Sequence, residues 1–419
     1  MLKNTFYTTL AKVAALIGYM GLDICIARVL NVNGYAEWAF FYSIVNILFC
    51  IGGLGINSSS KVFIAKQNSL EGKKKSYTIS FGLRIVSSLV VAIIIVFFSY
   101  IIGNVYDFSD KYPNMNQMLM LGAGMFFFFS VTEFYKETAV GLEKYQAMFV
   151  YTFFENVGYL IGVITCLAIY PSPVSVPLGY IVGGIIVFTV GICLGKKDLF
   201  VEVRAKEEVR NTIVKIIRYA LPIAIMGLGG AILLEMDVFM LGLMSTKEQL
   251  SVYSIAKQWC FKAVHANQIL ITAGMTTFSI LNKENIVEKT KKFKKLAFLN
   301  FTVTLVVMLT MIIILPYILL WLYGEDYKEV IPVLRLLTFY YGLYGISTFY
   351  ATFLDFQNRA KVRSIYYCSI IVINLVLNFL LIPQYGAKGA TLATIVSLIP
   401  YTICVFIESN KCLKSYRNK

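Results

Sequence analysis

The stretch TISFGLRIVSSLVVAIIIVFFSYIIG, from Thr78 to Gly103, decides the fold class of this chain. Beyond Arg84 it contains no charged residue as far as Gly103. A helix needs about 20 mostly apolar residues to cross the hydrocarbon layer of a membrane, and this stretch is long enough. It therefore predicts a transmembrane helix.

Runs of this kind recur along the chain, and the composition agrees with them. Of the 419 residues, 58% are hydrophobic and only 15% are charged, whereas about a quarter of the residues of a soluble domain are charged. We therefore predict an all-α membrane protein of about 12 transmembrane helices. The predicted spans are Thr8–Leu30, Trp38–Ile56, Thr78–Gly103, Met118–Val140, Met148–Ala168, Val174–Gly195, Tyr219–Met244, Ser251–Leu281, Leu296–Leu322, Val330–Leu354, Ile365–Ile382 and Gly389–Ile407.

The basic residues predict an orientation. The net charge is +15, which in a soluble protein would suggest a nucleic-acid partner. Here 30 of the 38 Lys and Arg residues lie in alternate connections on one predicted side and 5 on the other. We attribute this charge to anionic lipid headgroups and the positive-inside bias, and expect no nucleic acid. The pattern predicts a multi-pass protein of the bacterial inner membrane with both termini in the cytoplasm.

The longest polar stretch divides the chain into two halves. We predict a six-helix bundle at 1–195, a basic cytoplasmic linker at 196–218, a second six-helix bundle at 219–408 and a cytoplasmic tail at 409–419. Short motifs recur at an offset of about half the chain: Leu22-Asp23-Ile24 is similar to Met236-Asp237-Val238. Duplicated halves are a common plan of transporters, so the two bundles should be pseudo-symmetric.

Catalytic patterns are absent from the sequence. It contains no phosphate loop of the form G-x-x-x-x-G-K-[ST], no H-E-x-x-H zinc motif and no G-x-S-x-G elbow. Its single histidine and its eight cysteines, none in a C-x-x-C pair, do not suit a metal site. We predict that the protein is not an enzyme and holds no metal or cofactor. Any transport would be passive or coupled to a proton or sodium gradient.

Cationic residues within the predicted spans are candidates for binding a substrate, because charge inside a membrane usually faces a wet cavity or the bundle interior. We interpret Lys257, Lys262 and His265 as the wall of a cavity that holds an anionic headgroup. Alternatively, they pair with buried acids, or Lys257 reaches the outer interface. Arg335 and Arg28 could each bind a phosphate through two hydrogen bonds, although Arg28 could instead lie at the interface.

Acidic residues within the spans are candidates for ion coupling. Asp23 and Asp237 occupy matching places in the two halves, and Glu235 lies beside the second. Buried carboxylates can carry a coupling proton or sodium ion; the alternative is structural pairing with Lys or Arg. A local ion-pair cluster is expected on the fourth and fifth spans, from Glu133, Lys136, Glu137 and Glu155.

One motif near the C-terminus resembles a known family. Asn374-Leu375-Val376-Leu377-Asn378, followed by Ile382-Pro383-Gln384-Tyr385-Gly386-Ala387-Lys388-Gly389-Ala390, is similar to the pattern N-x-x-x-N-x-x-L-I-P-x-Y-G-x-x-G-A of the Wzx-type polysaccharide biosynthesis or O-antigen flippases. These proteins share the MOP superfamily with MATE exporters and lipid II flippases. Further segments that resemble family patterns are Ala27–Leu30 with Asn33–Ala36 (where Asn31 and Ala36 replace glycines), Gly53–Ile56, Tyr219–Pro222 and Tyr323–Tyr327.

The resemblance implies a MATE-like fold in which two six-helix bundles form a V-shaped cavity. It implies alternating-access transport of an undecaprenyl-diphosphate-linked oligosaccharide, an O-antigen (lipopolysaccharide) or capsule repeat unit, from the inner to the outer leaflet. Partners would be membrane lipids, a polysaccharide polymerase and a chain-length regulator. One alternative is a MATE-type ion-coupled drug exporter, which should favour acidic cavity residues over Lys257 and Lys262. Another is a membrane polymerase or ligase, against which the short outer loops argue.

Overall fold

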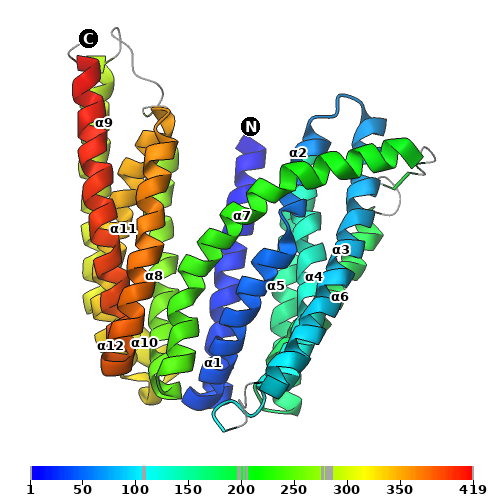
Figure 1. Cartoon of the computed structure of the whole chain (residues 1–419), viewed down its shortest axis with the longest axis horizontal. Coiled ribbons are helices and arrows are strands. Elements are labelled where there is room, and N and C mark those ends of the chain that lie inside the picture. Colours follow the sequence, from blue (N-terminus) through cyan, green and yellow to red (C-terminus); the bar gives the residue numbers. More distant parts are fainter. Residues whose placement is uncertain are drawn as a thin grey trace. The chain divides into compact units, whose positions relative to one another are not determined.

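The computed structural model describes residues 2–105, 110–195, 200, 201, 203, 206–274, 278 and 286–417. Within these ranges all regular structure is helical (Figure 1), which confirms the predicted all-α class. The elements are α1 (Leu2–Gly53), α2 (Ile56–Ala65), α3 (Leu70–Val105), α4 (Met115–Gly141), α5 (Tyr145–Ile169), α6 (Ser175–Gly195), α7 (Lys206–Met244), α8 (Lys247–Gly274), α9 (Ile286–Ile313), α10 (Leu315–Tyr323), the 3₁₀ helix η1 (Glu325–Tyr327), α11 (Val330–Phe356) and α12 (Ala360–Arg417).

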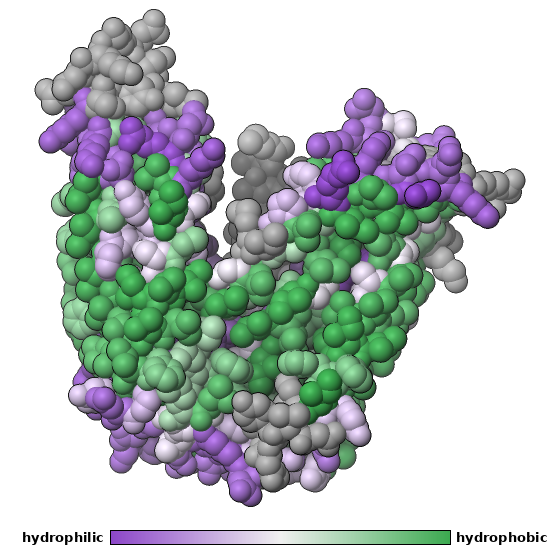
Figure 2. All heavy atoms as spheres, in the orientation of Figure 1, coloured by the Kyte–Doolittle hydropathy of each residue, from purple (hydrophilic) through white to green (hydrophobic). Residues whose placement is uncertain are grey.

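Nine helices of the described chain are long and apolar enough to cross a membrane. Two of them, over Ala14–Gly53 and Ala360–Lys414, have 40 and 55 residues, enough for two spans each. Helix α8, which carries Lys257 and Lys262, is not among the nine. The count of twelve spans therefore stays a prediction. Figure 2 shows apolar side chains over the middle of the helices in each half of the chain, with hydrophilic side chains toward the helix ends.

Each of the two longest helices is interrupted where the sequence predicts a connection between spans. Helix α1 breaks at Asn31 (φ 58°) and α12 at Gly386 (φ 54°). A positive φ is adopted readily only by Gly and, less often, by Asn. At Gly386 space is restricted too, because an added Cβ would lie 2.7 Å from Oε1 of Gln249. The same oxygen accepts a hydrogen bond from the backbone N–H of Ala387 at 3.0 Å.

Several element boundaries differ from the sequence prediction. The predicted span Leu296–Leu322 is divided at Ile314 between α9 and α10, because Pro316 has no N–H to continue the helical hydrogen bonds. Helix α7 begins at Lys206, so the described end of the predicted basic linker is helical. Residues 196–199, 202, 204 and 205 of that linker, 275–277 and 279–281 of the predicted span Ser251–Leu281, and 418–419 of the predicted tail lie outside the described residues.

The chain forms two compact units, Met1–Glu235 and Met236–Lys419, with their boundary inside α7. The predicted domain limits therefore stay a prediction. In the first unit α5 and α6 meet along a seam of glycines, the small-xxx-small arrangement common between membrane helices. A Cβ on Gly183 would lie 2.5 Å from the backbone of Gly158, and one on Gly158 would lie 3.0 Å from Gly183 O. In the second unit α11 packs against α8, α9 and α12.

Candidate functional site

The most fully enclosed acidic group among the sequence candidates is Asp237, near the end of α7. Its side chain is 3% exposed. Tyr253 Oη and Thr394 Oγ1 donate hydrogen bonds to its Oδ2 at 2.6 and 2.8 Å, and Asn378 Nδ2 donates to its Oδ1 at 2.5 Å. These donors come from α8 and from both halves of α12. Three donors on two oxygens compensate the carboxyl group for the water that burial removes.

The two asparagines of the motif Asn374–Asn378 have a structural explanation in this cluster. They lie one helical turn apart on α12, and the Asn378 amide donates one hydrogen to Asp237 and the other to Asn374 Oδ1 at 3.0 Å. Asn378 Oδ1 is buried and has no hydrogen-bond partner among the described atoms.

The other two acidic candidates lie in the first unit. Asp23 is 6% exposed, and its Oδ1 accepts a hydrogen bond from Tyr35 Oη at 2.8 Å, across the break in α1. Glu235 is half-buried, and its Oε1 accepts from Asn46 Nδ2 at 3.0 Å. The Asp23–Tyr35 pair resembles the Asp237–Tyr253 pair of the second unit in chemistry. Both units thus keep a buried carboxylate bonded to a tyrosine.

Helix α8 presents a polar face that is not covered by the rest of its unit. Gln258 and Lys262 are half-buried, and His265 and Gln268 are exposed. Their spacing of four, three and three residues puts all four on one side of the helix. Lys262 Nζ donates to Gln258 Oε1 at 3.3 Å, and His265 Nδ1 lies 3.0 Å from Gln268 Oε1. The face combines a cation, an imidazole and two amides, which are groups that hydrogen-bond anionic oxygens.

The remaining cationic candidates are separated from that face. Lys257 is buried (8% exposed), and its Nζ lies 5.9 Å from the centre of the Phe261 ring. Of the three residues predicted to form the cavity wall, Lys262 and His265 lie on the open face of α8 and Lys257 does not. Arg28 and Arg335 are both exposed, on α1 and α11 of different units. Of the five cationic candidates, therefore, Lys262, His265 and Arg335 are at least partly exposed in the second unit and Arg28 is exposed in the first.

A buried amide network that the sequence did not reveal fixes α8 in its unit. Asn267 donates to Asn300 Oδ1 at 2.9 Å and to Thr304 Oγ1 at 2.7 Å, and accepts from Tyr341 Oη at 2.5 Å. Asn300 in turn donates to the carbonyl of Gly345 at 3.1 Å. These contacts join α8, α9 and α11 and direct the Lys262 face away from them. The sequence signal was only that polar residues occur in apolar helices.

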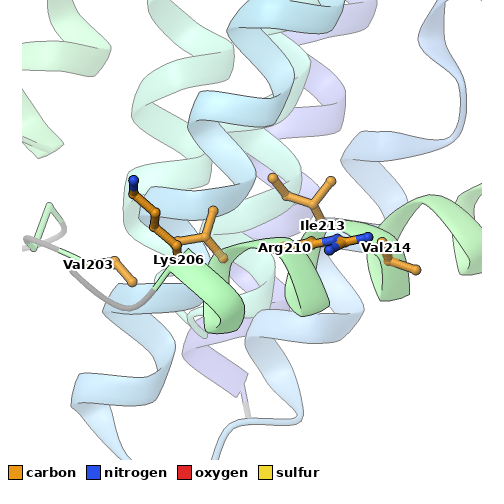
Figure 3. Close-up of a pocket in the computed structure, with 6 residues that line it drawn as sticks. Val203, Lys206, Arg210, Ile213 and Val214 are labelled. Atoms are coloured by element: carbon orange, nitrogen blue, oxygen red, sulfur yellow. The ribbon is translucent and has the colours of Figure 1, made fainter.

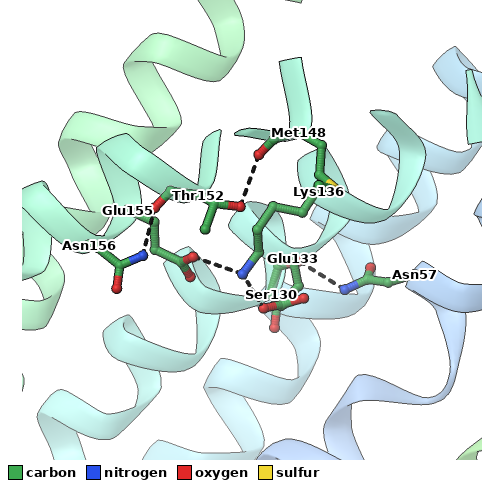
Figure 4. Close-up of polar contacts among 8 residues, drawn as sticks. All are labelled: Asn57, Ser130, Glu133, Lys136, Met148, Thr152, Glu155 and Asn156. Atoms are coloured by element: carbon green, nitrogen blue, oxygen red, sulfur yellow. Dashed lines mark hydrogen bonds and ion pairs between the residues drawn. The ribbon is translucent and has the colours of Figure 1, made fainter. Parts of the chain in front are cut away.

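The ion-pair cluster expected in the first unit is present, with one change of partner. Lys136 Nζ lies 2.8 Å from Glu155 Oε2 and 2.5 Å from Glu133 Oε1 (Figure 4). Glu137 instead pairs with Lys61 of α2 at 2.5 Å. The Glu155 side chain is 1% exposed, and its Oε1 has no hydrogen-bond partner among the described atoms. The cluster thus joins one buried carboxyl group, Glu155, and one partly exposed one, Glu133, to a single ammonium group.

Solved structures with the same fold are membrane transporters. The chain is similar to a structure described as "Lipid II flippase MurJ, inward closed conformation", with a TM-score of 0.75, 16% identity, and 99% of this chain and 90% of that chain covered. It is also similar to an outward-facing multidrug resistance MATE family transporter of the MOP superfamily, with a TM-score of 0.65, 11% identity, and coverage of 99% and 95%. At these identities the likeness shows the fold, which confirms the MATE-like prediction.

A third structure with this fold is described as a MOP superfamily transporter from Pyrococcus furiosus whose reversed binding-pocket polarity suggests a different function (TM-score 0.56, 12% identity, coverage 99% and 94%). None of the curated proteins compared with the chain matches it. The family model described as "Polysaccharide biosynthesis protein" matches residues 1–278, which is most of the chain. This multi-pass membrane protein belongs to the polysaccharide biosynthesis protein family.

Proposed function

We propose that the protein is a flippase that moves an undecaprenyl-diphosphate-linked oligosaccharide from the inner to the outer leaflet of a bacterial cytoplasmic membrane. The observation that carries the proposal is the open cationic face of α8, with Lys262 and His265, on a fold shared with a lipid II flippase. A diphosphate headgroup is anionic, and ammonium and imidazole groups stabilise it by charge-assisted hydrogen bonds. Family membership supports a substrate from polysaccharide assembly, such as an O-antigen or capsule repeat unit.

The same face distinguishes this proposal from export of cationic drugs. An exporter of cations favours carboxylates in its cavity, because opposite charges attract most strongly away from water. On α8 the two ionisable groups of the open face are Lys262 and His265. MATE transporters share the fold, so drug export remains the alternative to test. The short connections between helices argue less directly against a polymerase or ligase.

Ion coupling through Asp237 forms the second part of the proposal. The carboxylate lies in a closed set of oxygen- and nitrogen-bearing side chains: Tyr253, Thr394 and Asn378, with Asn374 behind. A sodium ion or proton would neutralise Asp237 and release the hydrogen bonds that join α7, α8 and α12. The packing of these helices would then depend on whether the ion is bound. Such dependence is what couples a gradient to a change between conformations.

Deleting the gene from its bacterial host tests the transport function. We expect single undecaprenyl-linked repeat units to accumulate in the inner membrane while surface polysaccharide disappears from gels. If the deleted gene encoded a polymerase instead, single repeat units would still reach the cell surface. Unchanged lipid intermediates with altered drug sensitivity would contradict the flippase proposal and favour the drug exporter.

Substitution of Lys262 tests the binding face. Loss of one hydrogen bond to a charged group costs about 1.5–3 kcal/mol, so transport by Lys262→Ala should fall roughly 10- to 100-fold. Lys361→Ala provides the matched control, because Lys361 is exposed near the start of α12. Transport would be measured by complementing the deletion strain, with membrane content checked by immunoblot. Wild-type surface polysaccharide from inserted Lys262→Ala would contradict the role of the face.

Substitution of Asp237 tests ion coupling separately. In proteoliposomes loaded with extracted lipid-linked repeat units, Asp237→Asn should make transport insensitive to an imposed sodium or proton gradient. Asp326→Asn is the control, because Asp326 is exposed in η1. A gradient response retained by Asp237→Asn would contradict coupling at this residue without affecting the flippase proposal.

A further inference from the structure

The first four turns of α7 have a surface divided into three faces. At 100° per residue, Ile216 and Ala220 point to one side, and both are buried (0% and 2% exposed). Tyr219 attaches the helix to α2, with its ring 5.9 Å from that of Phe63 and 5.7 Å from Lys66 Nζ. This side of the segment therefore faces the protein. The remaining two sides are exposed, and they differ from each other.

The second face is apolar although it is exposed. Val214, Ile217 and Leu221 are 50%, 49% and 59% exposed, and at helical spacing they fall within an arc of about 60°. Arg210 lies on the same arc, one turn before Val214. An apolar strip of this kind, left open beside a basic residue, is unfavourable in water. The strip therefore requires an apolar environment next to it.

The third face is polar and adjoins the second. Asn211, Lys215 and Arg218 are exposed and occupy the next arc of about 60° around the helix. Protein on one side, apolar surface on the next and charge on the third is the pattern of a helix lying in the plane of a membrane interface. In that position the apolar strip meets acyl chains and the polar face meets water.

A mostly apolar groove lies at the start of this segment, beside the Lys206 and Arg210 side chains. It has a volume of about 340 Å³ and is lined by Val203, Lys206, Val209, Arg210, Ile213 and Val214. Figure 3 shows the Lys206 and Arg210 side chains on the same helix as Ile213 and Val214. Within the described part of the chain, neither cation forms a salt bridge with a carboxylate.

We propose that Lys206 and Arg210 bind the headgroup phosphate of an anionic phospholipid, whose acyl chains cover Val214, Ile217 and Leu221. The charge is complementary to the headgroup, and the apolar strip continues directly from the cations along the direction that an acyl chain would take. Free phosphate would use the cations but leave the strip exposed. A nucleic acid would likewise make no use of it. The site is independent of the flippase proposal, since it lies on α7 outside the α8 face and the Asp237 cluster.

Lipid binding to the full chain in neutral detergent tests this site. Native mass spectrometry would follow titration with phosphatidylglycerol and, separately, with phosphatidylcholine. Each basic residue near an anionic surface strengthens binding roughly five-fold, so Lys206→Gln/Arg210→Gln should bind phosphatidylglycerol about 30-fold more weakly. Lys215→Gln/Arg218→Gln removes the same charge from the polar face and should stay within about threefold of the wild type.

Hydrogen–deuterium exchange locates the effect on the helix. Phosphatidylglycerol should slow exchange over residues 206–221, whereas inorganic phosphate at the same concentration should not. Val214→Ser/Ile217→Ser should weaken phosphatidylglycerol binding while leaving both cations in place; these side chains are half exposed, so the fold is retained. Equal losses in the two charge variants, equal binding of both lipids, or protection by inorganic phosphate would each overturn the proposal.

Discussion

Lys136→Met should strongly destabilise the first unit. Lys136 Nζ contacts Glu155 Oε2 at 2.8 Å, and the Glu155 side chain is only 1% exposed. Methionine keeps the unbranched chain as far as Cε but removes the cation, so the buried carboxylate loses its ion-pair partner. Glu155 Oε1 already has no hydrogen-bond partner among the described atoms (Figure 4). Nothing else described in contact with that carboxylate carries a positive charge.

The expected loss of stability follows from how deeply each partner is buried. Removing one member of a buried ion pair costs about 3–5 kcal/mol. Glu133, with a side chain 31% exposed, should contribute much less, so Glu133→Gln should cost less than about 1 kcal/mol. At roughly 2–4 °C per kcal/mol for a unit of this size, Lys136→Met should lower Tm by about 10 °C. Replacing both buried partners, as in Lys136→Met/Glu155→Met, should restore most of the loss.

Thermal unfolding of the purified full chain in detergent measures these differences, with Glu133→Gln as the control at the same cluster. A Lys136→Met protein as stable as the wild type would refute the buried-charge argument. A double variant as unstable as the single would show that packing, and not charge, determines the loss.

Three further changes address other parts of the molecule, each measured by thermal unfolding. Gly386→Ala should lower the free energy of unfolding by about 1 kcal/mol or more, because its φ of +54° disfavours a Cβ and Gln249 Oε1 occupies the space. As a comparison, Gly227→Ala should leave stability unchanged or raise it, because a Cβ there would meet no atom within 4 Å. Tyr341→Phe should cost about 1–3 kcal/mol by depriving buried Asn267 Oδ1 of its donor. Glu137→Gln should cost less than about 1 kcal/mol, because its ion pair is about a third exposed.

The sequence predicts the helices well because membrane spans are selected by length and apolarity, properties that are local. It also places both connections within α1 and α12, since Asn31 and Gly386 lie between apolar runs. The break before α10 was missed, although Pro316 was visible within the run. The helical start of α7 was missed because its polar residues were interpreted as a linker, while its three-sided pattern appears only once buried and exposed positions are known.

The site is predicted less completely, because partners on different helices cannot be inferred from one sequence. Asp237 was identified from its charge and its place in the repeat, but its bonds to Tyr253 and Thr394 depend on how α8 and α12 pack. On α8, periodicity alone could not decide which side is covered. The contacts of Asn267 bury one side and leave Lys262 on the other, apart from Lys257.

The glycine seam between α5 and α6 has a consequence for how the protein is made. The two helices are joined by only the five residues from Tyr170 to Val174, and their contact through Gly158, Gly162, Gly179 and Gly183 is between backbones. Close packing of neighbouring segments can form without any later part of the chain. We therefore expect this hairpin to assemble in the bilayer during translation, before α7 leaves the ribosome. The growing chain would then have a rigid pair of helices against which α1 and α4 can settle.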